Sequence, residues 1–362
     1  MKNFELTKLG VQSVQQPDLV KASNPLYRFY KNANVRFIFF GALLCLIPYL
    51  KDLGILNSGM IITLGGAIIY AIAALGLNLL LGYAGLVSLG VAGFIGLGAY
   101  VTAYFTNDLS ITFWIAALSS IILATLIGLL VGLVSLRVSG LYLAISTLCV
   151  SEILLKTFES FDMITGGMTG KRASYPTFFA AALTREGTFI LLVILLVLMM
   201  MLTRNLIKGS FGRALHAMRG SEVAAQAMGV NLLKYRLLAF ALSTAYAALA
   251  GALYVVFIRS AYPTTWTITL SLNILAVVVI GGFRSIYGTV LGSLIVFVVP
   301  DLLLKKLPVI GEIPGLAYIF SGVMIVIVIM FYPAGLIKLF SDARDLALRP
   351  FSRKNKERKA VS

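Results

Sequence analysis

The sequence contains little charge, two cysteines and a single histidine. Charged side chains make up 12% of its 362 residues, against roughly 25% in soluble domains, and none lies between Asp52 and Asp108. Cys45 and Cys149 are far apart within apolar runs, which excludes a CxxC pair and a disulfide framework. His216 has no metal-ligating or catalytic companions around it in the sequence. These shortages argue against a soluble domain, a disulfide scaffold and a metal site.

The sequence consists mainly of long hydrophobic runs. Hydrophobic residues make up 59% of the chain, and the mean hydropathy is +0.96. The uncharged stretch between Asp52 and Asp108 is too long for one helix across a hydrocarbon core of roughly 30 Å, so it must cross twice. The sequence therefore predicts an all-α, polytopic membrane protein. Outside the stretch 270–304, hydropathy places crossings at 37–50, 60–81, 86–105, 113–136, 139–155, 187–203, 237–258 and 316–332.

The stretch 270–304 is apolar, but Arg284 interrupts it within "GGFRSIYG", so it forms either one crossing or a hairpin of two. Lys and Arg concentrate in loops on the cytoplasmic side of a membrane. With a hairpin, about ten crossings put both termini inside. The inside segments then contain 22 basic and six acidic residues, and the outside segments are neutral overall. This one-sided net charge of +16 indicates membrane topology, with attraction to anionic lipid, and not a nucleic-acid footprint.

The chain is rich in glycine around the second and third crossings, in "GLNLLLGYAGLVSLGVAGFIGLGAY". Gly82 and Gly85 bracket a predicted bend between these crossings, because glycine adopts the backbone angles of a tight turn. The same bend is a candidate part of a translocation path. Other glycines leave surfaces where a second helix can approach closely. They are Gly93, Gly96 and Gly98, and two pairs spaced four residues apart, Gly128 with Gly132 and Gly288 with Gly292.

Three of the polar residues within the predicted crossings bear on the translocation path. Asn78 and Ser88 need hydrogen-bonding partners or a water-filled cavity at membrane depth, so they either pack inside the protein or line the path. Glu152 is an acidic residue within a predicted helix, and Lys156 lies four residues on, where the two can pair. Glu152 therefore either reaches water or Lys156 at the outer end of its helix, or lines the translocation path.

The segment "FGRALHAMRGSEVAAQAMGVN" interrupts the apolar runs with basic, alanine-rich sequence. Ser210 and Ser221 are the predicted N-caps of two short helices. Gly229 is predicted to end the second helix in the left-handed conformation. The two predicted helices are 211–219 and 222–228.

The predicted topology places this segment on the inside face. Alanines at 224, 225 and 227 make the second helix slim. The segment is either a projection offered to another protein or an ordinary basic loop. The charged residues predicted to be exposed on it are Arg213, Arg219 and Glu222.

Together with the following run "YRLLAFALSTAYAALAGALY", this segment resembles the cytoplasmic loop and next helix of branched-chain amino acid ABC transporter permeases of the LivM/LivH type. The resemblance extends to the glycine-rich stretch, to "ITGGMTG", "VIGGFRSIYGTVLGS" and "FYPAGL", over most of residues 60–340. It implies that the loop 204–236 contains a coupling helix, which seats in a groove of a cytosolic ATPase. The residues implied in ATPase coupling are Arg213, Arg219, Ser221, Glu222, Ala224, Ala225 and Gly229.

Two positions depart from the family pattern. The general loop signature is Glu-Ala-Ala-x-x-x-Gly. Ala224, Ala225 and the glycine fit it, but Val223 occupies the glutamate position and Glu222 stands one residue earlier. In the glycine-rich stretch, Val91 stands where relatives often place a polar residue, which bears on the substrate.

The energy for transport is expected to come from a partner. "GGMTGKR" has three residues between the glycines where a phosphate-binding loop needs four, and no Ser or Thr follows Lys171. The chain is thus predicted to need no cofactor, with ATP bound by partner subunits. The resemblance implies three kinds of partner: cytosolic ABC ATPase subunits, a second homologous permease and a periplasmic substrate-binding protein. The outside segment 156–187 is a candidate docking surface for the last.

The resemblance implies a permease subunit in a bacterial inner membrane that imports branched-chain or other neutral amino acids. A related branch of the family carries urea and short amides, and this alternative stays open. An ion-coupled secondary transporter would need an intramembrane carboxylate cluster, whereas this chain offers Glu152. The predicted organisation is a cytoplasmic extension (1–35), a transmembrane permease domain (36–340) and a basic cytoplasmic tail (341–362).

Overall fold

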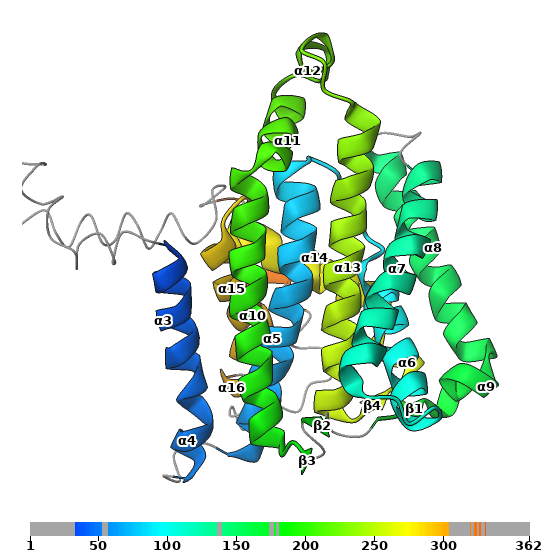
Figure 1. Cartoon of the computed structure of the whole chain (residues 1–362), viewed down its shortest axis with the longest axis vertical. Helices are drawn as coiled ribbons and strands as arrows, with labels where there is room; N and C mark the ends of the chain where they lie inside the picture. Colours follow the sequence, from blue (N-terminus) through cyan, green and yellow to red (C-terminus); the bar gives the residue numbers. More distant parts are fainter. Residues whose placement is uncertain are drawn as a thin grey trace, which may run out of the picture.

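A computed structural model describes residues 33–303 except 53–56, 136–139, 174–176 and 179–180, together with single positions between 319 and 330. The described residues form a bundle of helices (Figure 1). Most of the predicted N-terminal extension, most of the predicted crossing at 316–332 and the whole predicted tail lie outside the described residues.

Among the described residues, six helical segments are long and apolar enough to cross a membrane. The all-α, polytopic architecture predicted from hydropathy is therefore confirmed. The six are α5 (Ser58–Asn78) with the π-helical η2 (Leu79–Tyr83), α7 (Phe113–Ser135), α8 (Leu141–Ser160), α10 (Arg185–Lys208), α13 (Leu232–Ile258), and η4 (Pro263–Thr265) with α14 (Ile268–Gly281).

Three further stretches complete the apolar part of the described bundle. α6 (Val91–Asn107) is largely buried, and two shorter apolar stretches lie at the ends of the described chain. These stretches are α3 (Ala33–Cys45) with α4 (Ile47–Asp52), and α15 (Ile286–Ser293) with the π-helical η5 (Leu294–Val298) and α16 (Val299–Leu303).

Several helix boundaries differ from the predicted ones, and two of these differences bear on the site. The third crossing was expected to begin at residue 86, but residues 84–90 are not helical and α6 starts at Val91. Gly85 there has a φ of 73°, which takes the chain out of the preceding helix. The crossing predicted at 187–203 extends to Lys208 as α10. Hydropathy marks only the apolar part of such a helix, and polar turns continue it at both ends.

α13 is the central helix, in contact with α5, α6 and α7. Small residues allow this close packing: a Cβ at Gly251 would overlap the backbone of α6, and a Cβ at Gly98 would overlap the Ala248 carbonyl. Gly128 of α7 lies just as closely against Thr244 of α13. Because lipid is as apolar as the helices, such close van der Waals contact is what holds a membrane bundle together. The predicted packing roles of Gly98 and Gly128 are confirmed.

α14 and α15 form the predicted hairpin, which turns at Arg284. Arg284 itself has a φ of 64°. Gly281 and Gly288 face each other across the hairpin, and a Cβ on either would overlap the carbonyl oxygen of the other. Gly292 lies equally close to the backbone of α14. The stretch 270–304 is thus two helices and not one.

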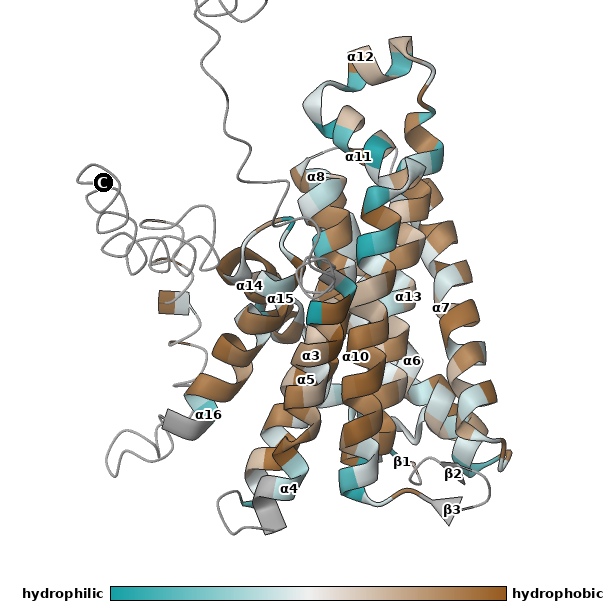
Figure 2. Cartoon of the chain, turned by 60° about the vertical axis from the view of Figure 1, so that its left-hand side comes forward, coloured by the Kyte–Doolittle hydropathy of each residue, from teal (hydrophilic) through white to brown (hydrophobic). Residues whose placement is uncertain are grey.

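The two ends of the bundle carry different structures. At one end, α11 (Ser210–Gly220) and α12 (Glu222–Ala227) project beyond the other helices (Figure 1). Figure 2 shows hydrophilic residues on this projection, above helices that are mainly hydrophobic. The opposite end carries α9 (Asp162–Thr165), η3 (Gly167–Thr169) and two antiparallel pairs of short strands, β1 (Lys171–Arg172) with β4 (Ser260–Ala261) and β2 (Thr177–Phe178) with β3 (Ala181–Ala182).

Candidate functional site

The projecting pair, α11 and α12, is shaped by local contacts. Ser221 Oγ accepts a hydrogen bond from the Ala224 N–H at 3.2 Å, and Gly229 follows α12 with a φ of 82°, both as predicted. Ser210 is not an N-cap, which corrects the prediction: it is the first residue of α11, and Gly209 occupies the cap position. Because α10 runs further than predicted, Gly209 is the one residue between α10 and α11.

One face of the projecting pair packs on the bundle and the other is exposed. Leu215, Met218 and Ala225 are buried. Val223 and Met228 expose 78% and 85% of their surface. Large apolar side chains this exposed on a hydrophilic projection are suited to contact another protein. The sequence analysis names neither residue as a contact. The signal available there for Val223 was that it replaces the glutamate of the loop signature.

Arg213, Arg219, Glu222 and Ala224 are exposed, as predicted for the charged three. The three charged residues also have partners within the chain, and Arg213 donates through Nη1 to the Lys208 carbonyl at 3.3 Å. Glu222 forms an ion pair with Arg236 of α13, and Arg219 donates a hydrogen bond to the Gly82 carbonyl. A surface ion pair contributes at most about 1 kcal/mol. The Glu222 pair therefore adds little to stability, and its side chain stays 55% exposed.

Residues 84–90, called here the interior bend, are held by hydroxyl groups of other helices. The first N–H groups of a helix have no partner within it, and non-helical backbone at membrane depth needs protein partners. At the bend and the start of α6, three N–H groups donate to side-chain hydroxyls at 3.0 Å. The pairs are Leu89 with Thr147, Ala92 with Ser271, and Gly93 with Ser151.

Ser88 lies within the interior bend and is buried. Its Oγ accepts a hydrogen bond from the Gly90 N–H at 3.4 Å. Together with Phe94, Phe240 and Thr244, it lines a cavity of about 10 Å³, the space of about one water molecule. The path-lining role of Ser88 stays a prediction.

Asn78 is buried near the end of α5, and the hairpin turn satisfies its amide group. Its Nδ2 donates to Thr289 Oγ1 at 2.8 Å and to the Ser285 carbonyl at 3.3 Å. Its Oδ1 accepts from the Arg284 N–H at 3.1 Å. Of the two roles that the sequence left open, packing inside the protein is observed. The path-lining role stays a prediction.

Glu152 is half-buried on α8, and this helix lies at one side of the described bundle in Figure 1. Lys156, which the helical spacing allows to pair with Glu152, instead binds Glu159 Oε2 through Nζ at 2.7 Å. The lysine side chain reaches toward the end of its helix, where its charge remains in water. Glu152 lies three residues after the exposed Cys149, so both lie on the side of α8 that faces away from the described bundle.

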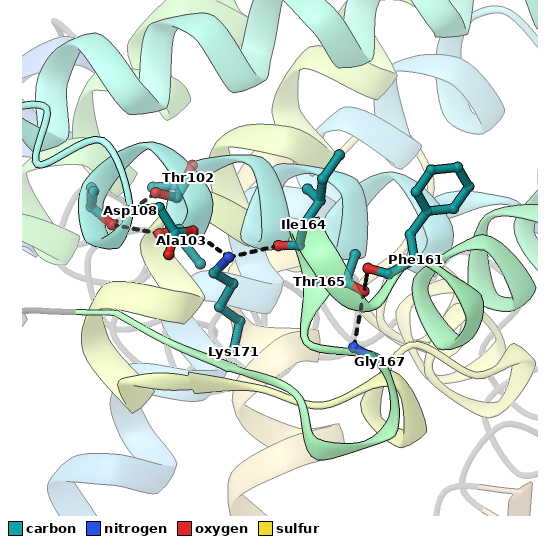
Figure 3. A network of polar contacts seen from close by, with 9 residues as sticks. Thr102, Ala103, Asp108, Phe161, Ile164, Thr165, Gly167 and Lys171 are labelled. Atoms are coloured by element: carbon teal, nitrogen blue, oxygen red, sulfur yellow. Dashed lines mark hydrogen bonds and ion pairs between the residues drawn. The ribbon is translucent and has the colours of Figure 1, made fainter.

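The loop at the opposite end is organised around Lys171 (Figure 3). Its ammonium group pairs with Asp108 and donates to the Ile164 carbonyl at 2.9 Å. Met163 and Met168 on this loop expose 87% and 68% of their surface. The predicted "TGGMTG" turns are confirmed, because positive φ angles occur at Gly166, Gly167 and Gly170.

His216 is exposed and lies edge-on to the ring of Tyr83, with 5.5 Å between ring centroids. Among the described residues, no group of three or more His, Cys, Asp or Glu side chains is placed to hold a metal ion. Gly82 and Gly85 lie beneath α11, and the Cγ of Arg219 is the nearest side-chain atom to a Cβ built at Gly85.

These features belong to a multi-pass membrane transport protein, and comparison with known sequences identifies its family. The chain belongs to the family described as branched-chain amino acid transport system / permease component, which matches residues 59–329. The predicted family is confirmed. No solved structure matches the chain.

The relatives are transport permeases. The high-affinity branched-chain amino acid transport system permease protein LivM of Escherichia coli is 29% identical over 296 residues, covering 75% of this chain and 68% of LivM. A probable LivM of Methanocaldococcus jannaschii is 29% identical over 315 residues, covering 74% and 90%. The ribose import permease protein RbsC of Haemophilus influenzae is 35% identical over 91 residues, covering 24% and 28%.

Proposed function

We propose that this chain is a permease subunit of an ABC importer in a bacterial inner membrane, and that it carries branched-chain or other neutral amino acids. Its family and its similarity to LivM support the substrate class. One structural observation carries the ABC mechanism: a capped helix pair projects from the bundle and exposes Val223 and Met228. Such a projection suits a rigid contact with a cytosolic ATPase, which would hydrolyse the ATP.

The coupling surface combines the residues named from the sequence with two that the structure adds. Arg213, Val223 and Met228 are free to contact the ATPase because they are exposed. Ser221 and Gly229 shape α12 and its exit, so they position the contact without making it.

The exposed faces of α7 and α8 support a second permease subunit as the next partner. α7 exposes aliphatic side chains such as Leu118, Ile122 and Leu126, which suit lipid. α8 also exposes apolar side chains such as Ile145 and Ile153, but it presents the thiol of Cys149 and the half-buried Glu152 among them. An acidic side chain facing lipid is costly, at about 2.5–3.5 kcal/mol near the bilayer centre. We therefore place the second permease against α8, with Glu152 lining the translocation path between the two subunits.

The loop around Lys171, which belongs to the predicted outside segment 156–187, is the proposed docking surface for a periplasmic substrate-binding protein. Lys171 links this loop to Asp108 and to the Ile164 carbonyl, and Met163 and Met168 are exposed on it. This assignment is part of the proposed ten-crossing topology, in which both termini lie in the cytoplasm. In a cysteine-free background, Thr169→Cys should react with an impermeant maleimide added outside intact cells. Ser362→Cys should react only after permeabilisation, and outside labelling of Ser362→Cys would refute ten crossings.

Uptake measurements test the function directly. In a strain that lacks its own permease, the chain with its ATPase partners should restore uptake of labelled leucine or alanine, and this uptake should follow the ATP level. Val223→Asp with Met228→Asp should abolish uptake and ATPase co-purification. Uptake that a protonophore stops while ATP is maintained would point to an ion-coupled transporter. Uptake of urea without leucine would move the substrate to short amides.

A further inference from the structure

Two arginines from separate segments converge on one backbone carbonyl beneath the projecting pair. Arg219, at the end of α11, donates through Nη1 to the Gly82 carbonyl. Arg284, in the hairpin turn, donates through Nε to the same oxygen at 3.3 Å. Carbonyl groups at the end of a helix lack intrahelical partners, and Gly82 is the second-last residue of η2. One oxygen thus joins the loop, the hairpin and the end of α5.

The hairpin turn is held to the same place through its backbone. The Arg284 carbonyl accepts from the Tyr83 hydroxyl at 2.6 Å, and the Arg284 N–H donates to Asn78 Oδ1 at 3.1 Å. A Cβ at Gly82 would overlap the Asn78 side chain and lie 3.1 Å from the Arg284 N–H nitrogen. Glycine at position 82 therefore permits this close approach of three segments.

The helix that ends at this junction is π-helical, from Leu79 to Tyr83. π-Helical turns are frequent at functional sites, because one extra residue in the turn leaves backbone groups free. The interior bend follows directly, and its hydrogen-bonding partners lie on α8 and α14. A displacement of η2 would thus reach the backbone that leads into α6.

The packing of α11 on the bundle does not depend on the hydrogen bond from Arg219 to the Gly82 carbonyl. Leu215 and Met218 already bury the inner face of α11. Burial, and then the neighbouring charge of Arg284, lower the pKa of the Arg219 guanidinium from its ordinary value. Two like charges at one acceptor oppose each other, so the shared carbonyl is a contact that a small movement of α11 can change.

We propose that Arg219 and Arg284, through the Gly82 carbonyl, form a relay that transmits movement of the projecting pair to the interior bend. This inference rests on the proposed function, since the movement originates in the ATPase. Arg219 is a positioning residue in this relay, acting on the bend through a backbone atom. The η2 turn and the hairpin move with it because the Gly82 carbonyl and the Arg284 backbone join them.

The test uses the full importer in proteoliposomes: this permease, its permease partner, the ATPases and the binding protein. The measured quantities are substrate uptake, ATP hydrolysis and uptake per ATP. The variants are Arg219→Ala, Arg219→Lys, Arg284→Ala and the double alanine variant. Arg284→Ala removes only the side-chain contact, because Asn78 and Tyr83 bind the Arg284 backbone. Lys234→Ala is the matched control, an exposed cation nearby on α13.

We expect Arg219→Ala to assemble and hydrolyse ATP while uptake per ATP falls at least about five-fold, the lower end of typical coupling between sites. Arg219→Lys should recover part of the loss, since its ammonium can donate to the same carbonyl. The double variant should lose less than the product of the two single losses, because both arginines act on one oxygen. Lys234→Ala should keep the wild-type ratio.

Two results would overturn the relay. Unchanged uptake per ATP in both single alanine variants would show that the arginines transmit nothing. Loss of ATPase co-purification in Arg219→Ala would make Arg219 part of the docking contact instead. The wild-type complex separates this test from that of the proposed function: if it shows no ATP-driven uptake of any substrate tried, the proposed function fails before the relay is reached.

Discussion

The projecting pair and the interior bend both interrupt helical runs, yet they satisfy their helix ends in opposite ways. In the projecting pair the cap is local, because Ser221 bonds three residues along the chain. At the interior bend and the start of α6, three N–H groups donate to hydroxyl groups 58 or 179 residues away, beside one local bond from the Gly90 N–H to Ser88 Oγ. A helix end in water can also bond to solvent, whereas one inside a membrane protein cannot. A helix interruption at the surface is thus capped by a residue close in sequence, whereas an interruption inside the bundle is capped mainly by residues of other helices.

The largest effect is expected in the projecting pair, at the residue that follows α12. Gly229→Pro should abolish uptake while the permease still reaches the membrane in normal amounts. Proline holds φ near about −65°, whereas Gly229 has a φ of 82° and its N–H donates to the Gln226 carbonyl at 2.9 Å. Quantitative blotting and uptake of labelled leucine measure the two quantities.

Gly229→Asn is the matched control, because asparagine tolerates the left-handed conformation. It should retain most of the uptake. If the proline variant transports as well as the wild type, the exit from α12 has no role in coupling and the projecting pair is an ordinary loop.

At the interior bend, Ser271→Ala should lower global stability. It leaves the Ala92 N–H without its acceptor inside the protein, and an unsatisfied buried donor costs about 1–3 kcal/mol. Thermal unfolding in detergent should show a lower midpoint. The control is Ser119→Ala, since the Ser119 hydroxyl is exposed and bonds within its own helix. Equal midpoints for the two variants would contradict the role given to the hydroxyls.

Ser221→Ala should have a smaller and more local effect. Loss of an N-cap costs about 1 kcal/mol, so amide exchange over Glu222–Ala227 should accelerate while the global unfolding midpoint changes little. Ser210→Ala should change neither, because Ser210 is the first residue of α11 and not its cap. Faster exchange in α11 from the Ser210 variant would restore the cap that the sequence predicted.

The smallest effect on folding is expected from Glu222→Lys. Its ion pair with Arg236 is exposed and contributes at most about 1 kcal/mol, so the unfolding midpoint should stay near that of the wild type. ATPase co-purification should nonetheless fall, because the charge of an exposed residue on the coupling surface is reversed. A variant that loses stability but keeps the ATPase would place the role of Glu222 within the chain.

Three expectations from the sequence differ from the structure. Residues 86–90 were assigned to a crossing because they are apolar, and hydropathy does not register that Gly85 ends the helix. Helical spacing allows Lys156 to pair with Glu152, four residues before it. It also allows a pair with Glu159, three residues after it and nearer to water, and the structure shows the second pair. Ser210 was assigned as a cap because α10 was expected to end several residues earlier. The first and the last of these differences concern where a helix ends, and the second concerns which neighbouring side chain a lysine reaches.

The sequence by itself determined the membrane class, the family, the hairpin at Arg284 and the caps at Ser221 and Gly229. Hydropathy, charge distribution and capping act over a few residues or over whole segments, so one chain displays them directly. Only the tertiary structure decided that Asn78 binds the hairpin and that two arginines meet at the Gly82 carbonyl. These partners lie between 137 and 211 residues apart, and no periodicity in the sequence records which distant polar groups a folded bundle brings together.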